Sequence, residues 1–352
     1  MKILVRATNW VGDAVMSIPA LEAARSRWPD AHISILARPW VADLYAGQPF
    51  ADRVIVFDHT GAHRGLFGVE RLAGELRRER FDVALLLQNA FEAAWIAWRA
   101  HIPERIGYSR DARGWLLTRA IAVPKKGEVP PHERYYYLEL LRRAGWLDQL
   151  PTVNEIHLRL PAEAREAAES ALVRAGSPRG ALRVALAPGA AYGSAKCWLP
   201  ERYAEVADRL IDEFNADVIL FGGASEQEIA RRIAAEMRHR PIGLVGQTRI
   251  GELPALFAAC HLFVGNDSGA MHVAAAVGLR GVAIFGPTDP YGTSPVTPHF
   301  ALVQQEVECS PCFLRHCPID HRCMTRVDAD SVFSAALTQI DSSRCSGSSA
   351  SE

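Results

Sequence analysis

Short apolar runs alternate with helical patterns along nearly the whole chain, and this alternation constrains the fold more than any other feature of the sequence. The apolar runs that predict strands are residues 3–6, 32–36, 53–57, 81–87, 183–187, 217–221, 261–264 and 281–286. Patterns typical of helices lie between them, at residues 13–27, 40–46, 66–78, 91–99, 135–144 and 200–214. Strands that alternate with helices form parallel, doubly wound sheets, so we expect an α/β fold.

The alternation starts twice, which predicts two domains in tandem with a cleft between them. A chain of 352 residues is long enough for two hydrophobic cores of ordinary size. The proline-flanked segment 151–161 interrupts the pattern and indicates the crossing from one unit to the next. We therefore expect domains at 1–155 and 156–341, and a disordered Ser- and Gly-rich tail at 342–352.

Composition and the start of the chain lead us to expect a cytoplasmic protein. The apolar share of 49% and the charged share of 22% are those of a soluble globular protein. No apolar run reaches the roughly 20 residues that a membrane span requires. The first predicted strand follows Met1 and Lys2 directly, which leaves no room for a signal peptide. We expect no nucleic acid partner.

The segment 263–290 predicts an anion-binding site in the second domain. A buried strand runs into Asn266-Asp-Ser-Gly269, and an Ala-rich helix that carries His272 follows. Helix-start amides attract anions, and Gly269 permits a close approach of a ligand to the backbone. The next strand ends in a second small-residue turn at 286–289, so two strand ends frame one crevice. The alternative is that Asp267 or Ser268 only caps the helix.

Two further strand ends of the second domain carry charged residues that suit a nucleoside diphosphate. Lys196 follows the strand at 183–187 and can neutralise phosphate charge, and Glu226 follows the strand at 217–221 and can accept hydrogen bonds from a ribose diol. Each also has a simpler interpretation, as a solvated lysine and as an acid at a helix start. Neither a G-x-G-x-x-G fingerprint nor a Walker A loop follows any strand.

Two features of the first domain carry charges that could take part in catalysis or in binding. Asp13 opens the helix after the first strand, where it can take a proton from an attacking hydroxyl or simply complement the helix dipole. The segment 99–126 is rich in basic residues, so it can face an anionic substrate or a membrane surface, or be a solvated basic face.

Four cysteines near the carboxyl end have a spacing that could chelate one metal ion. They are Cys309, Cys312, Cys317 and Cys323, with His316 and His321 between them. The alternative is a compact loop of reduced thiols, since seven cysteines in a reducing compartment argue against a disulfide framework.

Several of these motifs together resemble the ADP-heptose:lipopolysaccharide heptosyltransferases of glycosyltransferase family 9. The matching motifs are Asn9-Trp-Val-Gly-Asp13, Pro188-Gly-Ala, Lys196-x-Trp198, Gly223-Ala-Ser-Glu226, Asn266-Asp-Ser-Gly-Ala-Met-His272 and Phe285-Gly-Pro-Thr-Asp289. They extend in order from Met1 to about Ile340, and the cysteine spacing resembles the type II members of the family rather than type I. In place of the hydroxyl residues that some members have before the lysine, this chain has Ala190-Ala-Tyr192.

The resemblance implies a GT-B architecture of two Rossmann-like domains, and it implies a reaction. The donor would be ADP-heptose, bound by the C-terminal domain, and the acceptor would be the first heptose of the lipid A-linked inner core, bound by the N-terminal domain. Transfer would invert the anomeric centre and need neither metal nor cofactor. The enzyme would contact the inner face of the cytoplasmic membrane peripherally.

The resemblance also implies roles for single residues. Asp13 would be the general base, Lys196, Ser268 and Gly269 would hold the diphosphate, Glu226 would bind ribose, and Asp267 and His272 would complete the donor site. For the acceptor we propose Asn9, Arg105, Arg110 and Arg113. The alternatives are a type I or later-acting heptosyltransferase, a nucleotide-sugar epimerase on the same fold, and a non-catalytic binder of nucleotide sugars.

Overall fold

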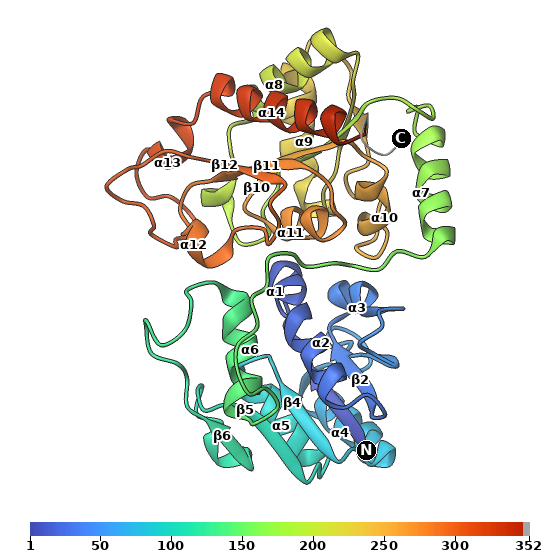
Figure 1. Ribbon diagram of the computed structural model, residues 1–352, viewed down its shortest axis with the longest axis vertical. Helices are drawn as coiled ribbons and strands as arrows, with labels where there is room; N and C mark the ends of the chain where they lie inside the picture. The colour runs from blue at the N-terminus through green and yellow to red at the C-terminus, as the bar shows by residue number, and fades with distance from the viewer. Residues whose placement is uncertain (348–352) are drawn as a thin grey trace. The chain divides into compact units, whose positions relative to one another are not determined.

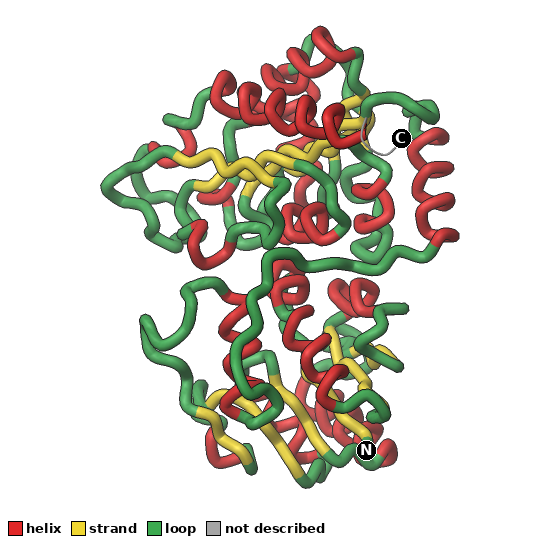
Figure 2. Tube along the Cα trace, viewed as in Figure 1, coloured by secondary structure: helices red, strands yellow, loops and turns green. Residues whose placement is uncertain are grey.

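The computed structural model describes the backbone of residues 1–347 and the side chains up to residue 342. The chain divides into two compact units, the first from Met1 to Val153 and the second from Asn154 onward. Each unit is an α/β layer structure with its own sheet, as Figures 1 and 2 show.

All six strands of the first unit are parallel, in the order β3-β2-β1-β4-β5-β6. The strands are β1 (Lys2–Arg6), β2 (His32–Ala37), β3 (Arg53–Val56), β4 (Val83–Leu86), β5 (Glu104–Tyr108) and β6 (Arg119–Ile121). The helices are α1 (Val11–Met16), α2 (Ile18–Arg27), α3 (Pro39–Tyr45), α4 (Gly65–Glu79), α5 (Phe91–Arg99), α6 (Glu133–Arg143) and the 3-10 turn η1 (Gly114–Leu116). Strand order reverses between β1 and β4, which makes this the topological switch point of the sheet.

Apolar side chains on both faces of the central strands form the core of the first unit. On one face, Leu4, Leu36 and Leu86 pack with Leu72 and Leu76 of α4 and with Ile96 of α5. On the other face, α2 packs beside α6. Continuous apolar runs in β1, β2 and β4 follow from this, because strands covered on both faces have no side open to water.

The second unit has six parallel strands in the order β12-β11-β10-β7-β8-β9. The strands are β7 (Arg183–Ala187), β8 (Asp217–Leu220), β9 (Ile242–Gly243), β10 (Leu262–Asn266), β11 (Gly281–Phe285) and β12 (Phe300–Gln304). The helices are α7 (Ala162–Arg174), α8 (Pro200–Phe214), α9 (Gln227–Glu236), α10 (Leu253–Ala258), α11 (Gly269–Ala276), α12 (Pro290–Thr293), α13 (Arg322–Thr325), α14 (Ala329–Gly347), η2 (Ser194–Lys196) and η3 (Ala224–Glu226). Its switch point lies between β7 and β10.

The core of the second unit lies between its sheet and helices α8, α9 and α14, on the side that Figure 1 places above the sheet. Val184, Val264 and Ile284 of the central strands pack there with Val206 of α8 and Val332 of α14. Helices α10 and α11 pack together on the other side of the sheet. Both faces of β7, β10 and β11 are therefore covered.

The expected fold class is confirmed, with three differences in detail. Residues 13–27 are not one helix, because α1 ends at Met16 and α2 starts at Ile18, with Pro19 in its first turn. The structure adds strands β5, β6 and β12 and helices α7, α12 and α13 to the elements expected from the sequence. Helix α14 extends to Gly347, so residues 342–347 are helical where disorder was expected, and residues 348–352 lie outside the described part of the chain. Among the described residues, no helix is long and apolar enough to cross a bilayer.

Candidate functional site

The predicted donor residues of the second unit come together at its topological switch point. β7 and β10 are hydrogen-bonded neighbours, with Leu186 opposite Val264 and Ala187 opposite Gly265. The loop after β7 carries Lys196, and Asp267 follows β10 directly. Because both strands are parallel, their carboxyl ends meet at one edge of the sheet, the position where doubly wound folds bind ligands.

Lys196, Asp267 and Thr288 form a buried polar cluster at this edge. Lys196 Nζ lies 2.5 Å from Asp267 Oδ2, and the Thr288 hydroxyl donates a 2.6 Å hydrogen bond to the same oxygen. The side chains of Lys196 and Asp267 are 13% and 4% exposed. The carboxylate is therefore held by partners from the loops after β7 and β11, and it does not cap helix α11. Sequence reasoning placed Thr288 in the adjoining turn but gave it no role.

Asn266, the last residue of β10, holds the Lys196 loop in place. Its amide donates to the Pro188 carbonyl at 2.6 Å, and its Oδ1 accepts from the Trp198 backbone NH and from the Tyr203 hydroxyl. Asn266 is fully buried, and each of these bonds replaces one that water would otherwise make. The sequence analysis included Asn266 in a motif without assigning this role, which depends on contacts distant in sequence.

Helix α11 starts at the same edge with an open N-terminus. Ser268 occupies the N-cap position but its side chain makes no capping bond, and its Oγ is buried with no hydrogen-bond partner among the described residues. The amides from Gly269 onward lack intrahelical acceptors, as in any helix start. His272 follows one turn later and is 4% exposed. The geometry favours an anion-binding helix start over simple capping.

Glu226 lies against the loop after β7. A Cβ atom added to Gly189 would come within 1.9 Å of Glu226 Oε1, so the carboxylate occupies the space that this glycine leaves. Its other oxygen accepts a 2.6 Å hydrogen bond from the Gly223 NH. Burial raises the pKa of this carboxyl, and the Gly223 hydrogen bond opposes the rise. Glu226 is therefore next to the loop that carries Lys196.

In the first unit, Asp13, Glu133 and Arg110 lie in one electrostatic neighbourhood. Asp13 is in the first turn of α1, after β1, and Glu133 is the first residue of α6, which packs against α1. Burial raises the pKa of Glu133 to about 7; the negative charge of Asp13 adds to this rise, and Arg110 opposes it. A carboxylic acid with such a pKa can exchange a proton near neutral pH. Sequence reasoning missed Glu133, because nothing local distinguishes it from any acid at a helix start.

The other predicted acceptor residues divide into supporting and exposed groups. Arg113 is fully buried and donates to the carbonyls of Tyr108 and Gln88. Arg105 is half-buried and donates to the carbonyls of Ile102 and Leu116. Both guanidinium groups thus support the loop after β5, and Arg110 is the exposed member of the three. Asn9 is half-buried and accepts a hydrogen bond from Arg6.

The four cysteines of the possible metal site differ in exposure. Cys309 and Cys312 are exposed, Cys317 is half-buried and Cys323 is buried. No group of three or more His, Cys, Asp or Glu side chains in the described part of the chain is placed to hold a metal ion. Burial, and the neighbouring thiols of Cys309, Cys312 and Cys317 to a smaller extent, raise the pKa of Cys323 to about 11.

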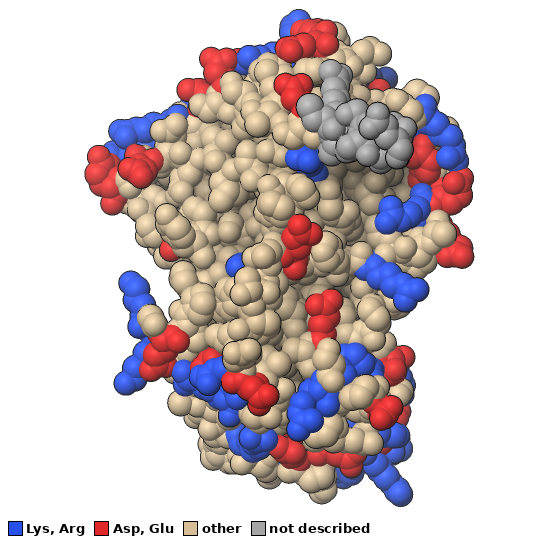
Figure 3. Space-filling model, in the orientation of Figure 1, with Lys and Arg blue, Asp and Glu red and all other residues tan. Residues whose placement is uncertain are grey.

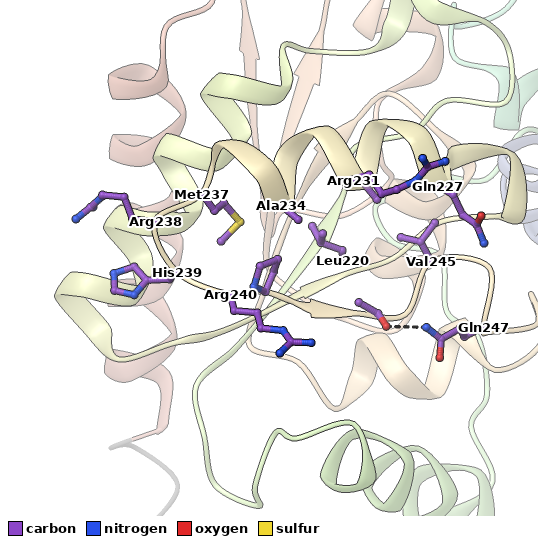
Figure 4. A pocket seen from close by; sticks show the side chains of 13 residues that line it. Leu220, Gln227, Arg231, Ala234, Met237, Arg238, His239, Arg240, Val245 and Gln247 are labelled. Carbon is purple, nitrogen blue, oxygen red and sulfur yellow. Dashed lines mark hydrogen bonds between the residues drawn. The ribbon is translucent and has the colours of Figure 1, made fainter.

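Surface features alone do not identify the site. On the face that Figure 3 shows, basic and acidic side chains are intermixed over the described residues. A surface pocket of about 580 Å³ lies between α9 and the edge strand β9 (Figure 4). Its lining includes Arg231, Arg240 and Gln247 but none of the predicted site residues. The Lys196–Asp267–Thr288 cluster is distinguished instead by its place at the switch point and by its hydrogen bonds.

Comparisons with known proteins point to one family of enzymes. The family model described as "Glycosyltransferase family 9 (heptosyltransferase)" matches residues 69–322. The lipopolysaccharide heptosyltransferase 2 of Salmonella typhimurium is 33% identical over 307 residues, covering 84% of this chain and 86% of that protein. The lipooligosaccharide heptosyltransferase 2 of Haemophilus influenzae is 30% identical over 314 residues, with coverages of 86% and 88%.

A solved structure shows the same architecture. ADP-heptose lipopolysaccharide heptosyltransferase II of Escherichia coli aligns with a TM-score of 0.82 and 27% identity, covering 98% of this chain and all of that chain. The glycosyl transferase family 9 protein of Veillonella parvula aligns with a TM-score of 0.84 at 24% identity, which shows the likeness of fold.

Proposed function

Because the chain belongs to glycosyltransferase family 9, the heptosyltransferases, we propose that it transfers heptose from ADP-heptose to the lipopolysaccharide inner core. The sugar is L-glycero-D-manno-heptose and the acceptor is the first heptose of the core, which is the step of a heptosyltransferase II. The names of the relatives that span most of the chain support this choice of step. The observation that carries the proposal is the Lys196–Asp267–Thr288 cluster beside the start of α11.

The donor half of the proposal follows from the chemistry of a diphosphate leaving group. Negative charge develops on the ADP oxygen as the glycosidic bond breaks, and preorganised donors lower the energy of that state. Lys196 and the first amides of α11 are such donors, and the Ser268 hydroxyl has no other hydrogen-bond partner among the described residues. Glu226 accepts hydrogen bonds from the ribose hydroxyls. We propose that these groups hold the donor without a metal ion.

The acceptor half assigns the proton to Asp13. The attacking acceptor hydroxyl loses its proton as the new bond forms, and a carboxylate at hydrogen-bond distance accelerates this step. Attack opposite the departing ADP inverts the anomeric centre. Glu133 increases the negative potential at Asp13 when it is ionised, and Arg110 offers an exposed cation to an anionic acceptor. Because the proposed acceptor is attached to lipid A, we further propose that the enzyme works at the cytoplasmic face of the membrane.

Release of ADP from ADP-heptose, measured with a panel of truncated core acceptors, tests the proposed step. We expect release to depend on an acceptor that ends in one heptose. Release with a core that lacks heptose would indicate a type I activity, and release only with longer cores a later-acting enzyme. Conversion of the donor with no acceptor present would support the epimerase, and donor binding without any turnover would support the non-catalytic binder.

A further inference from the structure

The donor site described above lacks a net positive charge. Lys196 is the cation of its central cluster, and Asp267 neutralises it at 2.5 Å. Glu226 adds a second carboxylate nearby, although burial raises its pKa. A nucleotide-sugar diphosphate carries a negative charge on each phosphoryl group, so an ion pair and helix amides alone give limited charge compensation. A second cation close to Lys196 would give the donor site the positive charge that the diphosphate requires.

Arg315 is in the right place to be this cation. Its guanidinium carbon lies 5.2 Å from the centre of the Tyr192 ring, and Lys196 Nζ lies 5.3 Å from the same centre. One phenol ring thus positions both cations by cation–π attraction. Arg315 is exposed, and no carboxylate pairs with it among the described residues. By contrast, Arg322 of the same segment is paired with Asp320 and Glu308.

The main chain fixes Arg315 beside the Lys196 loop. The Ala195 NH donates to the Arg315 carbonyl at 3.0 Å, and a Cβ atom added to Gly193 would lie 2.2 Å from that carbonyl oxygen. The neighbouring contacts are the Tyr192 hydroxyl to the Phe313 carbonyl and Ser194 Oγ to His316 Nδ1. Replacing Gly193 would therefore separate the two segments. The cysteine-containing loop thus lies directly against the loop that carries Lys196.

We propose that Arg315 binds the diphosphate of the donor together with Lys196. An arginine fork can donate two hydrogen bonds to a phosphoryl group, which lysine cannot do with the same geometry. This assignment rests on the proposed function, because it concerns the same donor. It also supplies polar contacts where Ala190 and Ala191 offer no hydroxyl.

Binding of ADP to the full-length protein by isothermal titration calorimetry tests this role. The variants are Arg315→Ala, Arg315→Lys and the control Arg326→Ala, which removes an exposed arginine of the same region. We expect Arg315→Ala to weaken ADP binding about tenfold, Arg315→Lys to recover part of the loss, and Arg326→Ala to have no effect. The Ala195 hydrogen bond uses the main chain of residue 315, so it remains in every variant.

The affinity for adenosine, measured by displacement of ADP, distinguishes a loss of phosphate binding from a structural effect of the substitution. We expect Arg315→Ala to leave adenosine affinity unchanged, since adenosine has no phosphate. Equal losses for adenosine and ADP, or unchanged ADP binding in Arg315→Ala, would overturn the assignment. Failure of the wild type to bind either ADP or ADP-heptose would instead contradict the proposed function itself.

Discussion

The Lys196–Asp267 pair shows, at the scale of single residues, how one contact serves both stability and binding. Breaking a buried pair by removing one partner leaves the other charge without compensation, at a cost of about 3 kcal/mol. We therefore expect Lys196→Met to lower the melting temperature clearly. The double variant Lys196→Met with Asp267→Asn should regain much of this stability while ADP binding stays weak. Calorimetric melting of all three proteins checks this, and a single variant as stable as the wild type would contradict it.

Glu226 is a residue where binding and stability conflict. Burial raises its pKa above the ordinary value of 4.5, so ionising this carboxyl in the folded protein costs free energy. That cost is absent below pH 4.5, grows as the pH rises, and is complete above the raised pKa. We expect Glu226→Gln to raise the melting temperature at neutral pH, on the order of 2 °C, and to weaken ADP binding.

Melting curves from pH 4 to pH 8 measure this effect directly. The increase in melting temperature of Glu226→Gln over the wild type should become smaller toward acid pH, because the side chain of residue 226 is then neutral in both proteins. Glu228→Gln is the matched control, since Glu228 is an exposed acid two residues further along the chain. An increase in melting temperature that becomes larger toward acid pH would contradict a raised pKa of Glu226.

Glu133 is expected to shape the pH dependence of transfer. Its pKa of about 7 reflects burial and the Asp13 charge, so each ionised carboxylate opposes ionisation of the other. Glu133→Gln removes the charge that Glu133 gains as the pH rises through about 7. The kcat/KM profile should then lose the inflection near pH 7 that ionisation of Glu133 produces. The exposed Glu128→Gln variant serves as control; an inflection near pH 7 that persists in Glu133→Gln would refute this role of Glu133.

At the scale of elements, the sequence predicts the covered strands well and the edges poorly. Strands β1, β7 and β10 are buried on both faces and read as apolar runs. Strand β6 has the sequence Arg-Ala-Ile and lies exposed at a sheet edge, so no such run marks it. Helix α7 buries only Ala168 and Leu172, which is too narrow an apolar stripe to detect. Local apolar patterns in the sequence indicate buried elements. Elements at the edge of a sheet lack such a pattern, because contacts with neighbouring elements hold them in place.

The site residues also fall into two groups. The local sequence predicts the positions of some, and contacts distant in sequence determine the positions of others. Lys196, Glu226 and Asp267 were predictable because each follows a strand that a parallel sheet must bring to one edge. The burial of Arg113 was not predictable, since its acceptors are the carbonyls of Tyr108 and Gln88 in the fold. Arg315 was not predictable either, because its neighbour Tyr192 lies far away in the sequence.

The contacts between the two donor-site loops allow a prediction for an element. The Tyr192 hydroxyl donates to the Phe313 carbonyl at 2.8 Å, and its ring positions Lys196 and Arg315. We expect Tyr192→Phe to keep most ADP affinity, since the ring remains, and Tyr192→Ala to lose about tenfold. Titration calorimetry with ADP measures both. Equal affinities of the two variants would show that the ring does not position the cations.

At the scale of the whole molecule, the two units provide different parts of one proposed reaction. Both sheets have the strand order of doubly wound nucleotide-binding folds, yet the candidate donor cluster is found in the second unit and Asp13 in the first. The proposed reaction uses the Asp13 carboxylate of the first unit and the donor cluster of the second, so it requires both units. Changes at Asp13 should therefore abolish transfer and leave donor binding intact.

The most direct test of the proposed transfer is the release of ADP from ADP-heptose in EDTA, with and without an acceptor that ends in one heptose. The proteins compared are the wild type and Asp13→Ala, with ADP affinity measured for both. We predict release that depends on the acceptor in the wild type, a loss of roughly 100-fold or more in the variant, and equal ADP affinities. Release in the variant at the wild-type rate, or release that does not depend on the acceptor, would contradict the proposed reaction.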